Sequence, residues 1–357
     1  NQGSFNLMCG IAGYINFRLQ DPQQILLKIK DALHHRGPDD FGIWHNHQAG
    51  LCHTRLSIID ISEKGRQPMS DTSSRFKLIF NGEIYNYLHL KKLLPDYQFK
   101  TNTDTEVLLA LLLNFPFETV LQKLEGMYAF SFYDTQENKL FLARDRLGQK
   151  PLLYYFKNDQ LIFGSEFSVF KQFPQLNLKP NHKTLRYYWK YGYIPSPDTA
   201  YENIHKLEPG TFLTFENGKC HKKTYWQLNP NENIKISWDE ALFRLEEILT
   251  TSIKNQLISD APLGIFLSGG IDSALITKIA SISTKAKIKT FNLGMNDISF
   301  DESMAAQNMA TALGTEHFHE MISLQISEDL DRIIQHFGEP FADSSAIPTY
   351  YLSKFVA

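Results

Sequence analysis

Short apolar runs dominate the first half of the chain and predict β-strands. Turn residues separate these runs, which lie at 9–15, 51–59, 77–80, 129–133, 139–144, 152–156 and 161–164. Lys157-Asn158-Asp159-Gln160 separates the last two runs, which predicts an antiparallel hairpin. Apolar residues at helical spacing predict helices at 22–33, 105–114 and 117–123. Strand–helix–strand alternation is too rare for a parallel fold, so the first half is predicted to be an α+β domain of sheets flanked by helices.

The pattern changes after about residue 170. Residues 171–233 are rich in Tyr, Pro and Gly, and the polar run 229–233 is the best linker candidate. Ser237 with Glu240 forms a capping box that starts a helix. Strand, loop, helix, strand and helix then alternate, at 263–267, 268–272, 273–282, 288–293 and 302–313. This order predicts a parallel α/β sheet that binds its ligand at the carboxyl ends of the strands.

Composition excludes several classes of protein. A length of 357 residues favours two domains, and a net charge of −3 without a long basic block argues against nucleic-acid binding. The longest apolar stretch, 107–113, is too short to cross a bilayer, and residues 1–8 do not resemble a secretory signal. Three cysteines favour a reducing compartment over a disulfide scaffold. We therefore expect a cytoplasmic protein without a membrane span.

The loop Ser268-Gly269-Gly270-Ile271-Asp272-Ser273 joins a predicted strand to a predicted helix. Consecutive backbone N–H groups at a helix N-terminus attract phosphate, and the two glycines allow the backbone to approach it closely. We expect ATP to contact this loop, and Asp272 to hold Mg²⁺ rather than touch phosphate directly. The residues expected at the ATP site are Leu267, Ser268, Gly269, Gly270, Asp272, Ser273 and Leu293. The simpler interpretation is a tight strand-to-helix turn with Asp272 as its cap. No lysine follows the glycines, and the loop resembles that of the PP-loop ATP pyrophosphatases.

Cys9 follows Met8 and precedes a glycine, near the start of the sequence. If Met8 were removed, Cys9 would carry a free α-amino group with a pKa of about 7.7–8.0, well placed to accept the thiol proton. An isolated cysteine in a strand is more often a small buried apolar residue. Other residues of the first half favour the catalytic interpretation.

Free glutamine offers a carboxylate, an ammonium and a side-chain amide. Arg55 is suited to the carboxylate, and Glu83 and Asp104 are suited to the ammonium. The Asn81 side chain and the Gly82 amide are candidates for an oxyanion hole. The ordinary alternatives are a surface arginine, a hairpin turn at Asn81-Gly82 and a helix N-cap at Thr103 or Asp104.

With these residues, the first half resembles a class II glutamine amidotransferase domain of the N-terminal nucleophile hydrolase fold, an αββα sandwich. His35-Arg36-Gly37-Pro38-Asp39 and Asp145-Arg146-Leu147-Gly148-Gln149-Lys150-Pro151-Leu152 fit the same pattern. A glutaminase followed by an α/β PP-loop domain resembles the asparagine synthetase (glutamine-hydrolysing) family. The expected domains are a leader or extension at 1–8, a glutaminase at 9–170, an interdomain segment that closes it at 171–233 and an incomplete PP-loop domain at 234–357.

The resemblance implies a mechanism in which Cys9 releases ammonia from glutamine while ATP and Mg²⁺ activate aspartate as its adenylate. Ammonia then displaces AMP, after crossing an internal passage that residues 188–197 either line or merely adjoin. The partners implied are glutamine, ATP and aspartate, and members of the family often form homodimers. Relatives continue beyond Ala357, and an arginine of well-known asparagine-forming members corresponds to Ser344. Two alternatives therefore stay open: another acceptor carboxylate, such as a surface-polysaccharide sugar acid, and a truncated, non-catalytic binding protein. We expect activity to require the loss of residues 1–8.

Overall fold

The computed structural model describes residues 8–230, 235–295, 301–322 and 326–356. They form two compact units. The first unit contains the described residues up to Leu228 together with Ile334–Asp343. The second unit contains the described residues of Asn229–Ile333 and Ser344–Ala357. Residues 1–7 and part of the predicted linker lie outside the described residues.

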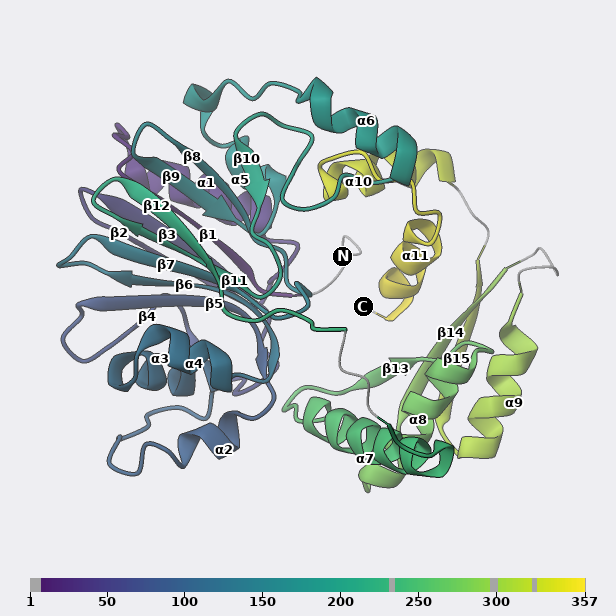
Figure 1. The fold of residues 1–357 in the computed structure, drawn as a ribbon. Coiled ribbons are helices and arrows are strands. Elements are labelled where there is room, and N and C mark those ends of the chain that lie inside the picture. Colours follow the sequence, from purple (N-terminus) through teal and green to yellow (C-terminus); the bar gives the residue numbers. More distant parts are fainter. Residues whose placement is uncertain (1–7, 231–234, 296–300, 323–325, 357) are drawn as a thin grey trace. The chain divides into compact units, whose positions relative to one another are not determined.

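Two antiparallel sheets form the centre of the first unit (Figure 1). In the described residues, the first sheet has the order β10 (Ile204–Lys206), β8 (Leu153–Lys157), β9 (Gln160–Gly164), β1 (Gly10–Ile15), β3 (Ala49–Arg55) and β2 (Asp40–His45). The second has the order β12 (Lys219–Thr224), β11 (Thr211–Glu216), β7 (Lys139–Arg144), β6 (Gly126–Asp134), β5 (Phe76–Ile84) and β4 (Met69–Ser70). Strands β10 to β12 come from the segment predicted to close the first domain.

Helices cover the outer faces of both sheets. The first unit contains α1 (Pro22–Leu33), α2 (Tyr87–Lys91), α3 (Asp104–Asn114), α4 (Phe117–Lys123), α5 (Phe167–Phe170), α6 (His182–Tyr191) and the short 3-10 turns Glu63–Gly65 and Pro174–Leu176. Helices α1 and α5 contact the first sheet, and α3 contacts the second (Figure 1). One apolar cluster, with Ile11, Leu51 and Ile79, lies between the sheets, and another, with Leu26 and Leu33, lies beneath α1. These four layers confirm the predicted αββα architecture.

Most predicted elements of the first unit are confirmed, with two corrections. Strand β3 ends at Arg55 rather than at residue 59, because the backbone beyond it turns to contact Cys9 instead of a neighbouring strand. The alternative of a hairpin turn at Asn81-Gly82 is wrong, since both residues lie within β5 and pair with β6. Pairing with a neighbouring strand has overridden the local turn preference.

The second unit contains a parallel sheet, as predicted. In the described residues its strand order is β13 (Gly264–Phe266), β14 (Lys289–Met295), β15 (Glu316–Ile322). The helices are α7 (Trp238–Gln256), α8 (Ile271–Ser283), α9 (Ser303–Leu313), α10 (Ile326–Phe337), which continues into the first unit, and α11 (Ala346–Val356). Ser237 caps α7 as predicted by accepting from the Glu240 amide. Gly314 ends α9 in the left-handed conformation.

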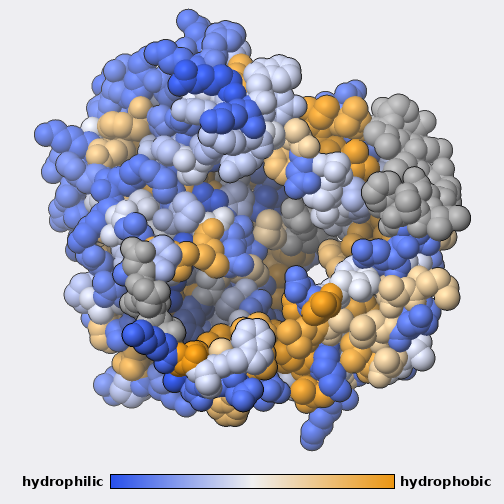
Figure 2. Space-filling view, turned by 45° about the vertical axis from the view of Figure 1, so that its right-hand side comes forward, coloured by the Kyte–Doolittle hydropathy of each residue, from blue (hydrophilic) through white to orange (hydrophobic). Residues whose placement is uncertain are grey.

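The second unit buries a smaller apolar core than the first, centred on Ile253, Ile279 and Ile288. Several large apolar side chains of this unit, including Phe243, Ile248 and Ile271, are exposed. Figure 2 shows hydrophobic residues, coloured orange, at the surface of the molecule. Among the described residues, no helix has the length and apolarity needed to span a lipid bilayer.

Candidate active site

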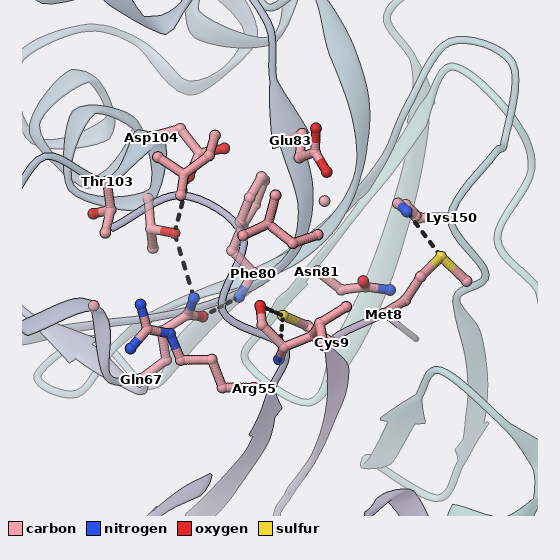
Figure 3. Close-up of a pocket in the computed structure, with 16 residues that line it drawn as sticks. Met8, Cys9, Arg55, Gln67, Phe80, Asn81, Glu83, Thr103, Asp104 and Lys150 are labelled. Atoms are coloured by element: carbon pink, nitrogen blue, oxygen red, sulfur yellow. Dashed lines mark hydrogen bonds between the residues drawn. The ribbon is translucent and has the colours of Figure 1, made fainter. Parts of the chain in front are cut away.

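Cys9 lies at the edge of a pocket, immediately before β1 (Figure 3). Its Sγ is 3.4 Å from the Leu56 amide nitrogen, which donates to it, and 3.6 Å from the Leu56 carbonyl oxygen. Burial raises the pKa of the Cys9 thiol, although Leu56 and the positive charges of Lys150, Arg36 and Arg55 oppose the increase. A thiol with a raised pKa is protonated at neutral pH, so nucleophilic attack requires a nearby proton acceptor.

The expected proton acceptor is the free α-amino group of Cys9, and Met8 is joined to that nitrogen by a peptide bond. The Met8 amide donates to the Arg36 carbonyl oxygen at 2.8 Å, and its Sδ is 2.8 Å from the Lys150 ammonium. With Met8 attached, the Cys9 nitrogen is a peptide nitrogen and cannot serve as a base. Met8 itself lines the pocket (Figure 3).

Asn81 and Gly82 lie on β5 beside Cys9. The Asn81 side chain is 1% exposed, and neither its oxygen nor its nitrogen has a hydrogen-bond partner among the described residues. A buried polar group without a partner is costly, and is most often found where a ligand supplies the missing bond. The side chain is therefore available to an atom that enters the pocket.

The backbone amide of Gly82 points to the same edge of β5 as the amides of Phe80 and Ile84, which lie two residues before and after it. The amide of Phe80 donates to Gln67 Oε1 at 2.6 Å, and the amide of Ile84 donates to Asp104 Oδ2 at 2.9 Å. Alternate residues of a strand direct their amides to the same side, so the Gly82 N–H lies between these two and faces the pocket. A side chain at Gly82 would clash, because an added Cβ would lie 2.1 Å from the Met127 carbonyl oxygen.

Arg55 closes another side of the pocket. Its guanidinium donates to the backbone carbonyl oxygens of Ser62, at 2.6 Å, and Asp60. Gly65 provides the space for this group, since a Cβ there would lie 2.2 Å from Arg55 Nη2. A guanidinium held in this way presents a fixed fork of donors, which suits a carboxylate.

Gly65→Ala is expected to raise the KM for glutamine about tenfold with little change in kcat, because the new methyl group displaces the guanidinium. Steady-state kinetics beside Arg55→Lys measures this effect. The double variant should add little to either single change, since both disturb the same contact. Fully additive effects, or an unchanged KM, would contradict the assignment.

Glu83 and Asp104 provide negative charge to the pocket. Asp104 is the first residue of α3. Of the two residues considered as the N-cap of this helix, Thr103 is the cap, and Asp104 is not. Burial, with the nearby Glu83 charge, raises the pKa of Asp104 to about 7, although the Ile84 amide lowers it. Burial also raises the pKa of Glu83, and Lys150 opposes this. An ammonium group in the pocket would stabilise both carboxylates.

Glutamine binding is therefore expected to weaken as the pH falls. Below a pKa of about 7 the free site holds Asp104 protonated, so the dissociation constant should rise about tenfold per pH unit. Calorimetry on Cys9→Ala, which should bind glutamine without hydrolysing it, measures this dependence from pH 5.5 to 8.5. Asp104→Asn should bind weakly at every pH in this range. The same pH dependence in Asp104→Asn would assign the titration to another group.

Three of the pocket residues that the sequence did not predict bear on its chemistry, namely Gly65, Gln67 and Lys150. Gly65 and Gln67 come from the loop between β3 and β4, and Lys150 follows β7. Lys150 belongs to the motif at 145–152, whose Asp145 carboxylate accepts from the amides of Tyr128, Leu147, Gln149 and Lys150. This motif is the sequence feature from which a role for Lys150 in the pocket could have been predicted. Nothing local distinguishes Gly65 or Gln67.

The glycine loop of the second unit connects β13 to α8. Leu267 is buried at the end of the strand, and its amide donates to the Phe291 carbonyl oxygen at 2.9 Å. Ser273 Oγ accepts from the Ser268 amide at 3.2 Å, and Ser268 Oγ accepts from the Gly270 amide at 3.1 Å. The Gly269 amide donates to Glu302 Oε2 at 3.1 Å, so this loop amide already holds an anionic oxygen.

The remaining predicted ATP-site residues lie at the same end of the sheet. Asp272 is exposed in the first turn of α8, which begins at Ile271 rather than at residue 273. Leu293 lies in β14, next to β13. The loop, an exposed carboxylate and parallel strand ends together suit a phosphate–Mg²⁺ group.

Two family models match the chain. The glutamine amidotransferase domain matches residues 8–226, and asparagine synthase matches residues 244–357. Asparagine synthetase [glutamine-hydrolyzing] 1 of Bacillus subtilis is 36% identical, over 97% of this chain and 55% of the relative. A putative asparagine synthetase [glutamine-hydrolyzing] 2 of Methanocaldococcus jannaschii is 35% identical, over 97% of this chain and 71% of the relative.

The chain thus spans about half to seven-tenths of the length of these curated relatives. A solved B. subtilis glutamine phosphoribosylpyrophosphate amidotransferase, complexed with ADP and GMP, has a TM-score of 0.47 and 18% identity, covering 90% of this chain and 70% of that one. With both family models matched in order, and a relative above 30% identity covered over more than two thirds of its length, the chain belongs to the glutamine-hydrolysing asparagine synthetase family.

Proposed function

We propose that this chain carries the glutaminase site and the ATP loop of an enzyme that makes asparagine from aspartate, with glutamine as nitrogen donor. The observation that carries the proposal is Asn81, whose buried amide has no partner among the described residues and lies beside the Cys9 thiol. Arg55 and Asp104 line the same pocket with the charges that the ends of free glutamine require.

In the proposed first half-reaction, Cys9 Sγ attacks the side-chain amide carbon of glutamine, and the free α-amino group of Cys9 takes the thiol proton. The Asn81 side chain and the Gly82 amide stabilise the oxyanion of the tetrahedral intermediate. The C–N bond then breaks as the amine returns its proton to the leaving ammonia. Water hydrolyses the resulting thioester to glutamate and restores the thiol.

In the proposed second half-reaction, the loop 268–273 binds the pyrophosphate of ATP, and Asp272 binds Mg²⁺. Leu267 and Leu293 would contact the nucleotide from the strand ends. The Gly269 amide, which now donates to Glu302, would donate to a phosphate oxygen instead. The acceptor carboxylate attacks the α-phosphate and releases pyrophosphate, and ammonia then displaces AMP.

The test is product analysis with glutamine, ATP, Mg²⁺ and aspartate, using the chain begun at Cys9 and a full-length relative as the positive control. Glutamate, asparagine, AMP and pyrophosphate are expected in equal amounts. Asp272→Asn should reduce AMP and pyrophosphate formation at least about a hundredfold and leave glutamate release unchanged, because the two sites lie in separate units. Equal loss of both activities would contradict these roles.

The acceptor is tested separately. Replacing aspartate with a sugar carboxylate in the same assay decides between the two acceptors, since AMP formation should depend on the correct one. Glutamate release without AMP formation from any acceptor would leave only the glutaminase part of the proposal.

A further inference from the structure

Ile334–Asp343, which we call the clasp, packs into the first unit although the chain on both of its sides belongs to the second. Glu339, in the middle of the clasp, binds it to the rest of the first unit. One carboxylate oxygen is 2.5 Å from the Lys206 ammonium, and the other accepts from the Ala200 amide at 3.0 Å. These two contacts join the clasp to the segment around β10.

Contacts on both sides of Glu339 fix the clasp further. The Tyr201 hydroxyl donates to the Gly338 carbonyl oxygen at 3.1 Å, and the Ala342 amide donates to the Gly192 carbonyl oxygen at 2.8 Å. Gly338 lies so close to Phe167 that an added Cβ would be 2.9 Å from the Phe167 Cβ. The clasp is therefore an integral part of the first unit.

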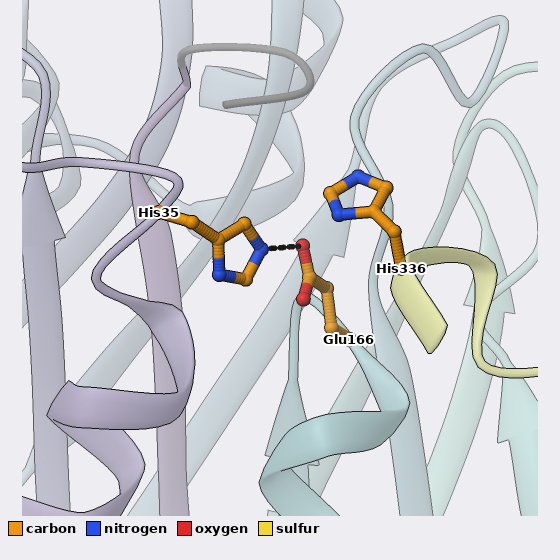
Figure 4. Close-up of side chains that lie close together, drawn as sticks. All are labelled: His35, Glu166 and His336. Carbon is orange, nitrogen blue, oxygen red and sulfur yellow. Dashed lines mark hydrogen bonds and ion pairs between the residues drawn. The ribbon is translucent and has the colours of Figure 1, made fainter. Parts of the chain in front are cut away.

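His336, near the start of the clasp, meets His35 and Glu166 (Figure 4). The two imidazole rings are 5.1 Å apart in an edge-to-face arrangement, and Glu166 Oε1 is 3.0 Å from His35 Nε2. Burial alone would raise the pKa of Glu166, but His35 and Arg36 lower it to about 2. Burial lowers the pKa of His336 to about 4, so its ring is neutral beside an ionised carboxylate at pH 7.

Arg36 connects this cluster to the nucleophile. Its side chain is buried, its Nη1 donates to Glu166 Oε1 at 2.9 Å, and its Nε donates to the Cys9 carbonyl oxygen at 3.1 Å. The guanidinium is thus held on one side by Glu166 and on the other by the backbone of Cys9. Glu166 and Cys9 therefore share one positioning group, the Arg36 guanidinium.

Two histidines and a glutamate are also a set that can bind zinc. Here Glu166 Oε1 already accepts from two donors, one of them a buried guanidinium at 2.9 Å. A divalent cation at this place would lie beside the buried positive charge of Arg36, which would repel it. The contacts favour a hydrogen-bonded cluster over a metal site.

We propose that Glu166 and His336 are positioning residues for Cys9. Through these two residues the clasp holds Arg36 in place, and Arg36 holds Cys9 in the correct position relative to Asn81 and Gly82. The inference rests on the proposed glutamine hydrolysis. Neither residue lines the glutamine pocket, so they should affect the rate of the chemical step rather than substrate binding.

The test uses the chain begun at Cys9 and its variants Glu166→Gln and His336→Ala. His34→Ala is the control, because His34 is exposed and adjacent to His35. We expect kcat for glutamate release to fall at least tenfold in Glu166→Gln and at least threefold in His336→Ala, with KM within twofold. His34→Ala should change neither value. Unchanged kcat, or a rise in KM alone, would overturn the proposal.

A second readout keeps the inference testable without turnover. Alkylation of Cys9 by iodoacetamide, followed by mass spectrometry of its peptide, should be at least threefold faster in Glu166→Gln, because Arg36 loses its counter-charge and favours the thiolate. The melting temperature shows whether each variant is folded, and if Glu166→Gln is not, the kcat and KM of His336→Ala decide the question. An unchanged alkylation rate in a folded Glu166→Gln variant would overturn the inference.

The remaining outcomes are separable. If the unmodified chain begun at Cys9 releases no glutamate, the proposed function fails, while the alkylation rates still decide the positioning role. Equilibrium dialysis with Zn²⁺ should show no binding that depends on His336. One equivalent of zinc bound by the unmodified chain and lost in His336→Ala would make the cluster a metal site and overturn the proposal.

Discussion

Cys9→Ala is expected to reduce glutamate release at least about a thousandfold, because the thiol forms the covalent intermediate and its loss leaves no nucleophile. Glutamine binding should change little, since Arg55 and Asp104 remain in the pocket. The measurement is glutamate production over time by the chain begun at Cys9, beside calorimetric binding of glutamine. Cys220→Ala is the matched control, because Cys220 lies on β12 and does not line the pocket.

The same assay addresses Met8. The form that retains Met8 should be as inactive as Cys9→Ala, for two reasons: its Cys9 nitrogen is not basic, and Met8 takes up space in the pocket, where its Sδ contacts the Lys150 ammonium (Figure 3). Equal activity of the forms with and without Met8 would show that another group accepts the thiol proton. Activity that survives Cys9→Ala would contradict the nucleophile assignment itself.

Asn81→Ala is expected to lower kcat for glutamine hydrolysis by a factor of about 10²–10³, the usual effect of removing one oxyanion donor. The Gly82 amide remains and accounts for the residual rate. Because the tetrahedral oxyanion exists only beyond the ground state, KM should change much less than kcat. Stopped-flow kinetics of glutamate release measures both values.

Stability provides an independent check on this variant. A buried amide without a partner destabilises the fold, so Asn81→Ala should melt at the same or a higher temperature than the unmodified chain. Asn114→Ala at the end of α3 is the matched control and should leave kcat unchanged. A large loss of stability with a proportional loss of activity would mean that Asn81 supports the fold and not the reaction.

Much of the fold follows from local patterns. The predicted helices at 22–33 and 117–123 coincide with α1 and α4, because apolar spacing and end signals fix a helix within its own sequence. The alternation after residue 262 correctly predicts a parallel sheet. Residues 204–224 escaped detection as strands, since short strands such as β10 depend on partners distant in sequence.

The sequence by itself determined the chemical types at the candidate sites: a thiol after a methionine, an arginine, an amide, two carboxylates and a glycine loop. Only the tertiary structure decided that Asn81 is buried without a partner, that Gly65 makes room for Arg55, and that Lys150 reaches Met8. It also decided that His336 lies beside Glu166, 170 positions away in the chain. The physical reason is that unmet hydrogen bonds, close backbone approaches and buried ion pairs arise from contacts between distant segments, whereas residue type and periodicity belong to the local sequence.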